Sequence, residues 1–218
     1  ILERRSREYG HAILLISDEP YRELAYDGAV VPYVTKYYAN TVVCYSYSKS
    51  LSLPGERIGY LVIPDELEDS AQVTAAAVIA NRVIGCVNAP SLMQRVIKRC
   101  LNAQVNLEAY NRNRHLLYES LTKYGFTCVK PEGAFYLFVK TPMEDKAFCE
   151  VCKKHRILVV PGGSFACPGY VRISYCVSYE QIERSLPAFR KVAKECGLME
   201  MCGGAAETCG QTAEGGQA

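Results

Sequence analysis

The first third of the chain contains three runs that are rich in apolar and branched residues, at 11–17, 41–46 and 57–63. Each run is bounded by Pro, Gly or Asn. The apolar positions are nearly continuous rather than alternating, which is typical of strands covered on both faces of a mainly parallel sheet. We therefore expect a sheet with flanking helices at the start of the chain.

The middle of the chain has a helical pattern. Residues 67–80 are rich in Ala, and apolar residues recur at helical spacing through 91–124, between Arg, Asn and Glu. Both features favour helices. We expect one helix in each stretch, the second being long and kinked near Asn102.

The pattern changes after Gly125 and predicts a smaller α+β unit. The expected elements are strands at 134–140, 157–160 and 170–175, a helix at 144–154 and a Pro/Gly loop at 161–168. Ser178 and Gln181 form a capping-box pair ahead of a helical apolar face, and Gly197 is expected to end that helix.

These elements predict an α/β chain in three parts. Residues 1–103 are expected to form part of a larger, mainly parallel domain, and residues 104–197 a small α+β domain that is entered by the long helix. Residues 198–218 contain three Glu, no Lys or Arg and no apolar period, so we expect a disordered tail.

Composition narrows the classes of partner. The net charge of +2, from 25 basic and 23 acidic residues, gives no reason to expect nucleic acid or an anionic membrane surface. No apolar stretch approaches the ~20 residues that span a bilayer, so we expect no membrane association.

The 11 Cys residues are odd in number and scattered, which favours reduced thiols and a cytoplasmic location. The chain begins without Met, and we expect its true start to lie upstream.

Candidate chemistry follows the second predicted strand. Ser46, Ser48, Lys49 and Arg57 lie within twelve positions of its end. Hydroxyl groups and a guanidinium suit a phosphate, and a lysine amine suits a carbonyl electrophile. Together they suggest a phosphorylated aldehyde cofactor.

A second group follows the first predicted strand, in the stretch that contains Asp18 and Tyr21. The carboxyl ends of neighbouring strands in such sheets converge on one crevice. We therefore expect the acidic side chain to lie near the lysine, where it could hold a heteroaromatic N–H.

Five stretches together resemble the pyridoxal 5'-phosphate-dependent aminotransferases of fold type I, in the class I/II group that includes aspartate and aromatic aminotransferases. They occur in family order between about residues 1 and 197. They are Ser-Asp-Glu-Pro-Tyr at 17–21, Ser-x-Ser-Lys at 46–49, Arg-Ile-Gly-Tyr at 57–60, Gly-Ala-Phe-Tyr at 133–136 and Tyr-Val-Arg-Ile-Ser at 170–174.

The resemblance implies specific roles for these residues. Lys49 would bind the cofactor aldehyde covalently and move the substrate proton. Asp18 would pair with the pyridinium nitrogen, and Tyr21 would hydrogen-bond the phenolic oxygen.

Two further roles concern anionic groups. Ser46, Ser48 and Arg57 would hold the cofactor phosphate, and Arg172 would bind the substrate carboxylate as a two-pronged fork.

The resemblance also implies the reaction and the assembly. The parent protein would transfer an amino group between an amino acid and a 2-oxo acid, and it would be a homodimer. The family's first half, which supplies further sheet strands and a phosphate-binding helix N-terminus, cannot be located in this chain. The 218 residues therefore resemble the C-terminal half, and we expect the isolated chain to be incomplete and inactive.

Other interpretations remain open. A carbon–sulfur β-lyase of the same fold would use the same lysine and cofactor, and an aminotransferase-like effector domain of a transcriptional regulator would sense the cofactor without using it. Singly, Lys49 could be a solvated side chain, Asp18 a turn cap, and Arg57 or Arg172 a surface charge.

A metal site is a further possibility in the helix expected at 144–154. Cys149, Cys152 and His155 have helical spacing but lack a second ligand pair, so we interpret them as a half-buried helix face and expect no metal.

Overall fold

The computed structural model describes residues 1–198. The chain divides into two compact units, the first comprising Ile1–Asn111 with Pro131–Phe135 and the second Arg112–Lys130 with the residues from Tyr136 onward. The tail expected at 198–218 lies outside the described residues, apart from Leu198.

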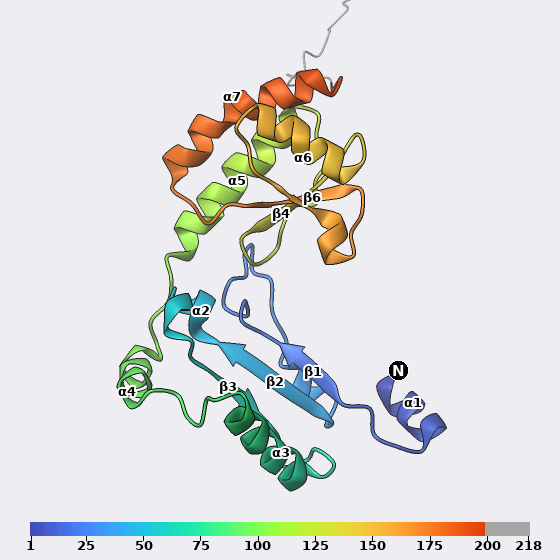
Figure 1. The fold of residues 1–218 in the computed structure, drawn as a ribbon, viewed down its shortest axis with the longest axis vertical. Coiled ribbons are helices and arrows are strands. Elements are labelled where there is room, and N and C mark those ends of the chain that lie inside the picture. Colours follow the sequence, from blue (N-terminus) through green and yellow to red (C-terminus); the bar gives the residue numbers. More distant parts are fainter. Residues whose placement is uncertain (199–218) are drawn as a thin grey trace, which may run out of the picture. The chain divides into compact units, whose positions relative to one another are not determined.

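The first unit contains a three-stranded sheet in the order β1-β2-β3 (Figure 1). The strands are β1 (Leu15–Asp18), β2 (Thr41–Ser46) and β3 (Gly59–Val62). β1 and β2 are parallel, whereas β2 and β3 are antiparallel. The helices of this unit are α1 (Leu2–Tyr9), α2 (Tyr47–Ser50), α3 (Ser70–Val83) and α4 (Ser91–Cys100), with 3-10 turns η1 (Val34–Lys36) and η2 (Pro54–Glu56).

Burial in this sheet differs from the expectation that all three strands are covered on both faces. The first three residues of β2 are buried, but β1 alternates between half-buried and exposed positions and every residue of β3 is exposed. The expectation is wrong for β1 and β3. The helix that follows β3 is itself poorly buried, since no residue of α3 is fully buried.

The helical middle of the chain is interrupted. The single long helix expected over 91–124 is instead two helices, α4 and α5 (Leu107–Lys123), separated by residues 101–106. A new helix start explains the interruption, because the side-chain oxygen of Asn106 accepts a hydrogen bond from the Ala109 N–H at 3.0 Å.

The second unit is built on an antiparallel sheet in the order β4-β6-β5 (Figure 1). The strands are β4 (Tyr136–Lys140), β5 (Val160–Pro161) and β6 (Tyr170–Ser174), and the helices are the rest of α5, α6 (Asp145–Lys154) and α7 (Tyr179–Glu195), with the 3-10 turn η3 (Gly162–Phe165). β5 overlaps the strand expected at 157–160 only at Val160, and η3 lies within the stretch 161–168 that was expected to be a loop.

The two faces of this second sheet differ. Leu137, Val139 and Val171 are at most 1% exposed and form the core face. Phe138 and Arg172 lie directly opposite each other in the β4–β6 register, so both lie on the other face. The sheet therefore presents an arginine among aromatic residues on the face that is not packed in the core.

The final helix follows the predicted signals. The Ser178 hydroxyl accepts a hydrogen bond from the Gln181 N–H at 3.2 Å, and α7 ends at Glu195, two residues before Gly197, whose φ is +70°. Both the start and the stop were predicted correctly. Within residues 1–198, no helix combines the length and the apolar character that crossing a membrane requires.

Candidate active site

The two parallel strands of the first unit end at the same edge of the sheet. Asp18 is the last residue of β1 and lies in register with Cys44, two residues before the end of β2. The Asp18 side chain is exposed, and within the described residues it makes no hydrogen bond or ion pair. Burial, and secondarily the charge of Asp18, raises the pKa of Cys44. This edge therefore carries a carboxylate without a fixed partner.

Lys49 lies at the same edge, in the single turn of α2. Ser46 caps that turn, because its hydroxyl oxygen accepts a hydrogen bond from the Ser48 N–H at 3.2 Å. The Lys49 ammonium lies 5.8 Å from the centre of the Tyr21 ring and 5.3 Å from the centre of the Phe135 ring. Aromatic faces attract a cation at these distances, so two rings orient the amine where no carboxylate of the described residues pairs with it.

Phe135 reaches this position through a long-range pairing. Ala25 and Gly133 form an antiparallel bridge, and the Ala134 N–H donates to the Leu24 carbonyl at 2.8 Å. The Phe135 and Tyr21 rings then meet edge to face, with centres 5.5 Å apart. Phe135 lies in the stretch 133–136 that resembles the family, but no role was predicted for its side chain.

The expected phosphate-binding residues are only partly gathered. The hydroxyl oxygens of Ser46 and Ser48 lie 2.7 Å apart. Arg57 is exposed, and its guanidinium donates to the Pro54 carbonyl at 2.9 Å rather than contacting either serine. Gly59 lets β3 approach β2 closely at this point, because a Cβ there would lie 2.2 Å from the Tyr45 carbonyl oxygen.

A cavity of about 530 Å³ lies in the first unit beside Asp18 and Tyr21, and neither Lys49 nor the serines at 46 and 48 are among its lining residues. Its lining includes Asp18, Tyr21 and the loop at 29–34. The lining also includes Glu19, Arg22 and Glu132 among apolar residues. The unpaired Asp18 carboxylate and the Tyr21 phenol are suited to a flat heteroaromatic ring with one polar nitrogen.

Arg172, in the second unit, is held by aromatic rings. Its guanidinium carbon lies 4.4 Å from the centre of the Tyr136 ring and 4.0 Å from that of Phe165. Phe165 also meets Phe138 edge to face, with centres 6.2 Å apart. Stacking occupies the face of a guanidinium and leaves its in-plane N–H groups for a carboxylate. Sequence reasoning missed both rings, because nothing in the local pattern links positions 136 and 165 to 172.

The cysteines of α6 belong to the core. Cys149 is 6% exposed and Cys152 is 0% exposed, and burial raises the pKa of Cys152 to about 12. His155 contacts Glu195 at 2.7 Å instead of a thiol. Within the described part of the chain, no three His, Cys, Asp or Glu residues are grouped as metal ligands would be.

Several known proteins are similar to this chain. It is 29% identical to aromatic-amino-acid aminotransferase 2 of Thermococcus litoralis, over 85% of this chain and 50% of the relative. It is 32% identical to an aspartate/prephenate aminotransferase of Thermus thermophilus, over 84% of this chain and 48% of the relative. The chain thus spans about half the length of the curated relatives it matches.

Solved structures give the same result. The fold matches the crystal structure of an amino transferase from Eubacterium rectale with a TM-score of 0.86 and 56% identity, over 89% of this chain and 49% of that chain. It matches an aspartate aminotransferase from Thermotoga maritima with a TM-score of 0.73 and 28% identity, over 88% of this chain and 50% of that chain. The resemblance drawn from the five sequence stretches and the α/β fold class predicted from the elements are both confirmed.

The model of the family described as aminotransferase class I and II matches residues 6–189, which is most of the sequence. This chain therefore belongs to the aminotransferase class I and II family.

Proposed function

We propose that the protein that contains this chain is a pyridoxal 5'-phosphate-dependent aminotransferase that transfers an amino group between an amino acid and a 2-oxo acid. The observation that carries the proposal is the pair of groups at one sheet edge: the Lys49 amine between the rings of Tyr21 and Phe135, and the Asp18 carboxylate without a fixed partner. Residues 1–103 would form part of the cofactor-binding domain and residues 104–197 the small domain.

The residues present fit this cofactor. Lys49 would hold the aldehyde carbon, Asp18 the pyridine nitrogen and Tyr21 the phenolic oxygen. Ser46 and Ser48 would bind the phosphate through hydroxyl groups that are already together. Arg57 would join them only after its guanidinium leaves the Pro54 carbonyl.

When bound, pyridoxal 5'-phosphate supplies an electron-withdrawing ring that accepts the electron pair released at the substrate α-carbon. The Asp18 carboxylate would keep a proton at the ring nitrogen, which strengthens that withdrawal. The Lys49 amine would take the proton from the α-carbon and return it at a neighbouring atom. Both roles require side chains that are not committed to internal ion pairs, and the described contacts of Asp18 and Lys49 meet that requirement.

Substrate recognition would depend on Arg172. A guanidinium can grip a carboxylate with two parallel N–H bonds, and the stacking of Tyr136 and Phe165 supports an orientation that leaves these N–H groups available. A homodimer, a cytoplasmic location and the absence of a nucleic-acid partner belong to the same proposal. No feature of residues 1–198 favours a carbon–sulfur β-lyase or a regulator's effector domain over amino transfer.

Labelling of the lysine tests the proposal. The protein is loaded with pyridoxal 5'-phosphate, reduced with borohydride and mapped by peptide mass spectrometry. We expect the label on Lys49, and we expect Lys49→Ala to lose both the label and transamination.

Lys98 is the control, because it lies exposed on α4 and does not line the cavity beside Asp18. Lys98→Ala should keep the label and the activity. Label on Lys36 or Lys98 instead of Lys49, or undiminished transamination by Lys49→Ala, would refute the proposal.

A further inference from the structure

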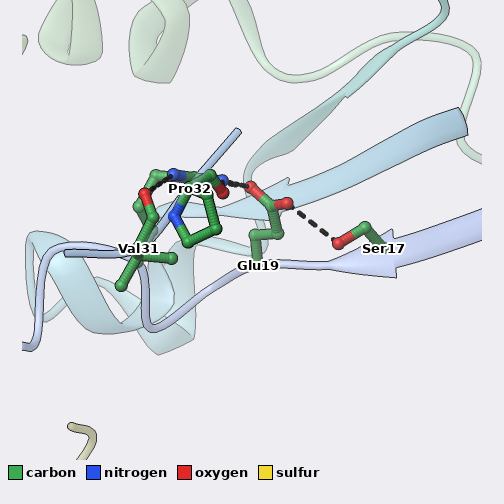
Figure 2. Close-up of polar contacts among 5 residues, drawn as sticks. Ser17, Glu19, Val31 and Pro32 are labelled. Atoms are coloured by element: carbon green, nitrogen blue, oxygen red, sulfur yellow. Dashed lines mark hydrogen bonds and ion pairs between the residues drawn. The ribbon is translucent and has the colours of Figure 1, made fainter. Parts of the chain in front are cut away.

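The two consecutive carboxylates at the end of β1 have different environments. Asp18 has no side-chain hydrogen bond within the described residues, whereas the Glu19 side chain is only 9% exposed and is engaged at both oxygens. The Ser17 hydroxyl donates to Glu19 Oε1 at 2.8 Å, and Arg22 Nε donates to Glu19 Oε2 at 2.8 Å (Figure 2). Arg22 Nη2 also donates to Glu19 Oε2.

Arg22 uses its remaining donors on the neighbouring loop. Its Nη1 donates to the Val31 carbonyl at 2.8 Å and its Nη2 to the Pro32 carbonyl at 3.1 Å. The guanidinium carbon lies 4.1 Å from the centre of the Tyr33 ring. One side chain, itself 11% exposed, therefore joins the end of β1 to the loop at 29–33.

The loop at 29–33 is poorly buried. Each of its residues is exposed, and Val30 is 86% exposed. Loops with few buried apolar contacts open easily unless specific hydrogen bonds fix them. Because the same loop lines the 530 Å³ cavity beside Asp18 and Tyr21, the Arg22 contacts determine the position of one cavity wall.

We propose that Arg22 and Glu19 are positioning residues for the cofactor pocket, an inference that rests on the proposed function of Asp18 as the partner of the pyridine nitrogen. Arg22 tethers the loop at 29–33 as a pocket wall. Glu19 neutralises the guanidinium, so that Arg22 does not pair with the adjacent Asp18 carboxylate. A lysine could neutralise Glu19 but could not also reach two carbonyls and stack on a ring.

Four variants separate the effect of the Glu19–Arg22 charge pair from the effect of the contacts between Arg22 and the loop at 29–33. Arg22→Lys keeps the charge pair and loses the loop contacts. Glu19→Gln leaves the guanidinium without its carboxylate, Arg22→Gln leaves Glu19 uncompensated, and the double variant removes both charges. Arg5→Gln is the matched control, because Arg5 and Glu8 form an ion pair of the same i,i+3 spacing at 2.6 Å on the exposed surface of α1.

The tether is measured by hydrogen–deuterium exchange over 27–36 and by spectral titration with pyridoxal 5'-phosphate. Arg22→Lys, Arg22→Gln and the double variant should exchange faster in this segment and bind the cofactor about tenfold more weakly, since each loses two hydrogen bonds from a charged group. If Arg22→Gln does not fold, Arg22→Lys still tests the loop contacts, because it keeps a positive charge beside Glu19.

The charge effect is measured by the visible absorption spectrum of the bound cofactor at one fixed pH. Glu19→Gln should lower the proportion of cofactor that is protonated at the pyridine nitrogen, because the free Arg22 guanidinium competes with that nitrogen for the Asp18 carboxylate. Arg22→Gln should raise that proportion, and the double variant should restore the original spectrum while keeping the fast loop exchange. A purely structural role for the pair would not produce opposite spectral changes.

Two failures are distinguishable. If the unmodified protein does not bind pyridoxal 5'-phosphate, the proposed function fails and this inference fails with it. If the unmodified protein binds the cofactor, and the Arg22 and Glu19 variants match Arg5→Gln within twofold in affinity and exchange with no spectral change, the inference alone is overturned.

Discussion

The guanidinium carbon of Arg172 lies 4.0 Å from the centre of the Phe165 ring, although the two residues belong to different elements, β6 and η3. The turn that carries Phe165 is fixed to α6 by a hydrogen bond from the Gly163 N–H to Asp145 Oδ2 at 2.8 Å. The orientation of the arginine thus depends on a short turn and on one carboxylate of a neighbouring helix.

Replacing Arg172 by Lys should separate substrate binding from cofactor binding. The ammonium keeps the charge but loses the planar fork and the stacking, so we expect KM for both the amino acid and the 2-oxo acid to rise about tenfold or more. The affinity for pyridoxal 5'-phosphate should stay unchanged. Steady-state kinetics and spectral titration measure the two effects. Arg184→Lys, on the exposed side of α7, is the control, and an unchanged KM for both substrates would contradict the role of Arg172.

Two adjacent glycines should respond differently to alanine. A Cβ at Gly162 would lie 2.2 Å from the Cys167 carbonyl oxygen and 2.6 Å from that of Tyr170, both of which are backbone atoms. We expect Gly162→Ala to lower the free energy of unfolding by about 1–3 kcal/mol. A Cβ at Gly163 would lie 3.3 Å from the Asp145 carboxylate, a side-chain atom. Gly163→Ala should therefore cost less in urea unfolding, and equal losses would contradict this explanation.

Asp145 should make the second unit sensitive to acid. The hydrogen bond from the Gly163 N–H holds the pKa of Asp145 below its usual value of 3.8. Since the folded state keeps this carboxylate ionised more readily than the unfolded state does, its stabilising effect is present above about pH 4 and is lost as the pH falls through the lowered pKa. In urea unfolding between pH 5 and 2.5, we expect the free energy of unfolding of Asp145→Asn to fall less steeply with decreasing pH than that of the unmodified protein. Asp65→Asn, which removes an exposed carboxylate, should leave this pH dependence unchanged. The same pH dependence in Asp145→Asn and in the unmodified protein would refute the role of Asp145.

Cys152 should be an unreactive thiol. It is 0% exposed, and burial raises its pKa from 9.0 to about 12. In native protein at pH 8, we expect iodoacetamide to modify the exposed Cys86 and to leave Cys152 intact by peptide mass spectrometry. The unfolded state releases this proton first, so the thiol should also destabilise the fold as the pH rises from about 9 towards 12. Equal modification of both cysteines would show that α6 opens under native conditions.

Local signals in the sequence were sufficient for several elements. The bounds of β2 agree with the predicted run, and the Ser178 cap fixes the start of α7, because both depend on neighbouring residues. The exposure of β3 and α3 could not be predicted from an apolar run, since burial depends on which other elements cover it. The position of the Arg57 guanidinium was equally hidden, because its hydrogen bond to Pro54 depends on a left-handed backbone at Arg57, with φ +50°.

The aromatic partners of the two candidate functional cations were missed for a related reason. Phe135 reaches Lys49 only through the pairing of Ala25 with Gly133, and Phe165 reaches Arg172 from a turn between two strands. Motif spacing identified the cations because their types are chemically distinctive. It did not identify the rings, since an aromatic residue in a strand or turn is usually explained by packing.

The antiparallel pairing of β2 with β3 has a consequence for the order of folding. The segment 47–58, which contains Lys49, joins the neighbouring antiparallel strands β2 and β3. The pairing of these two strands therefore closes only this short connection. Asp18 reaches the same edge only when β1 pairs in parallel with β2 across the longer connection 19–40. Because shorter loops close at lower entropic cost, we expect the amine to reach its position before the carboxylate does when the complete unfolded chain refolds.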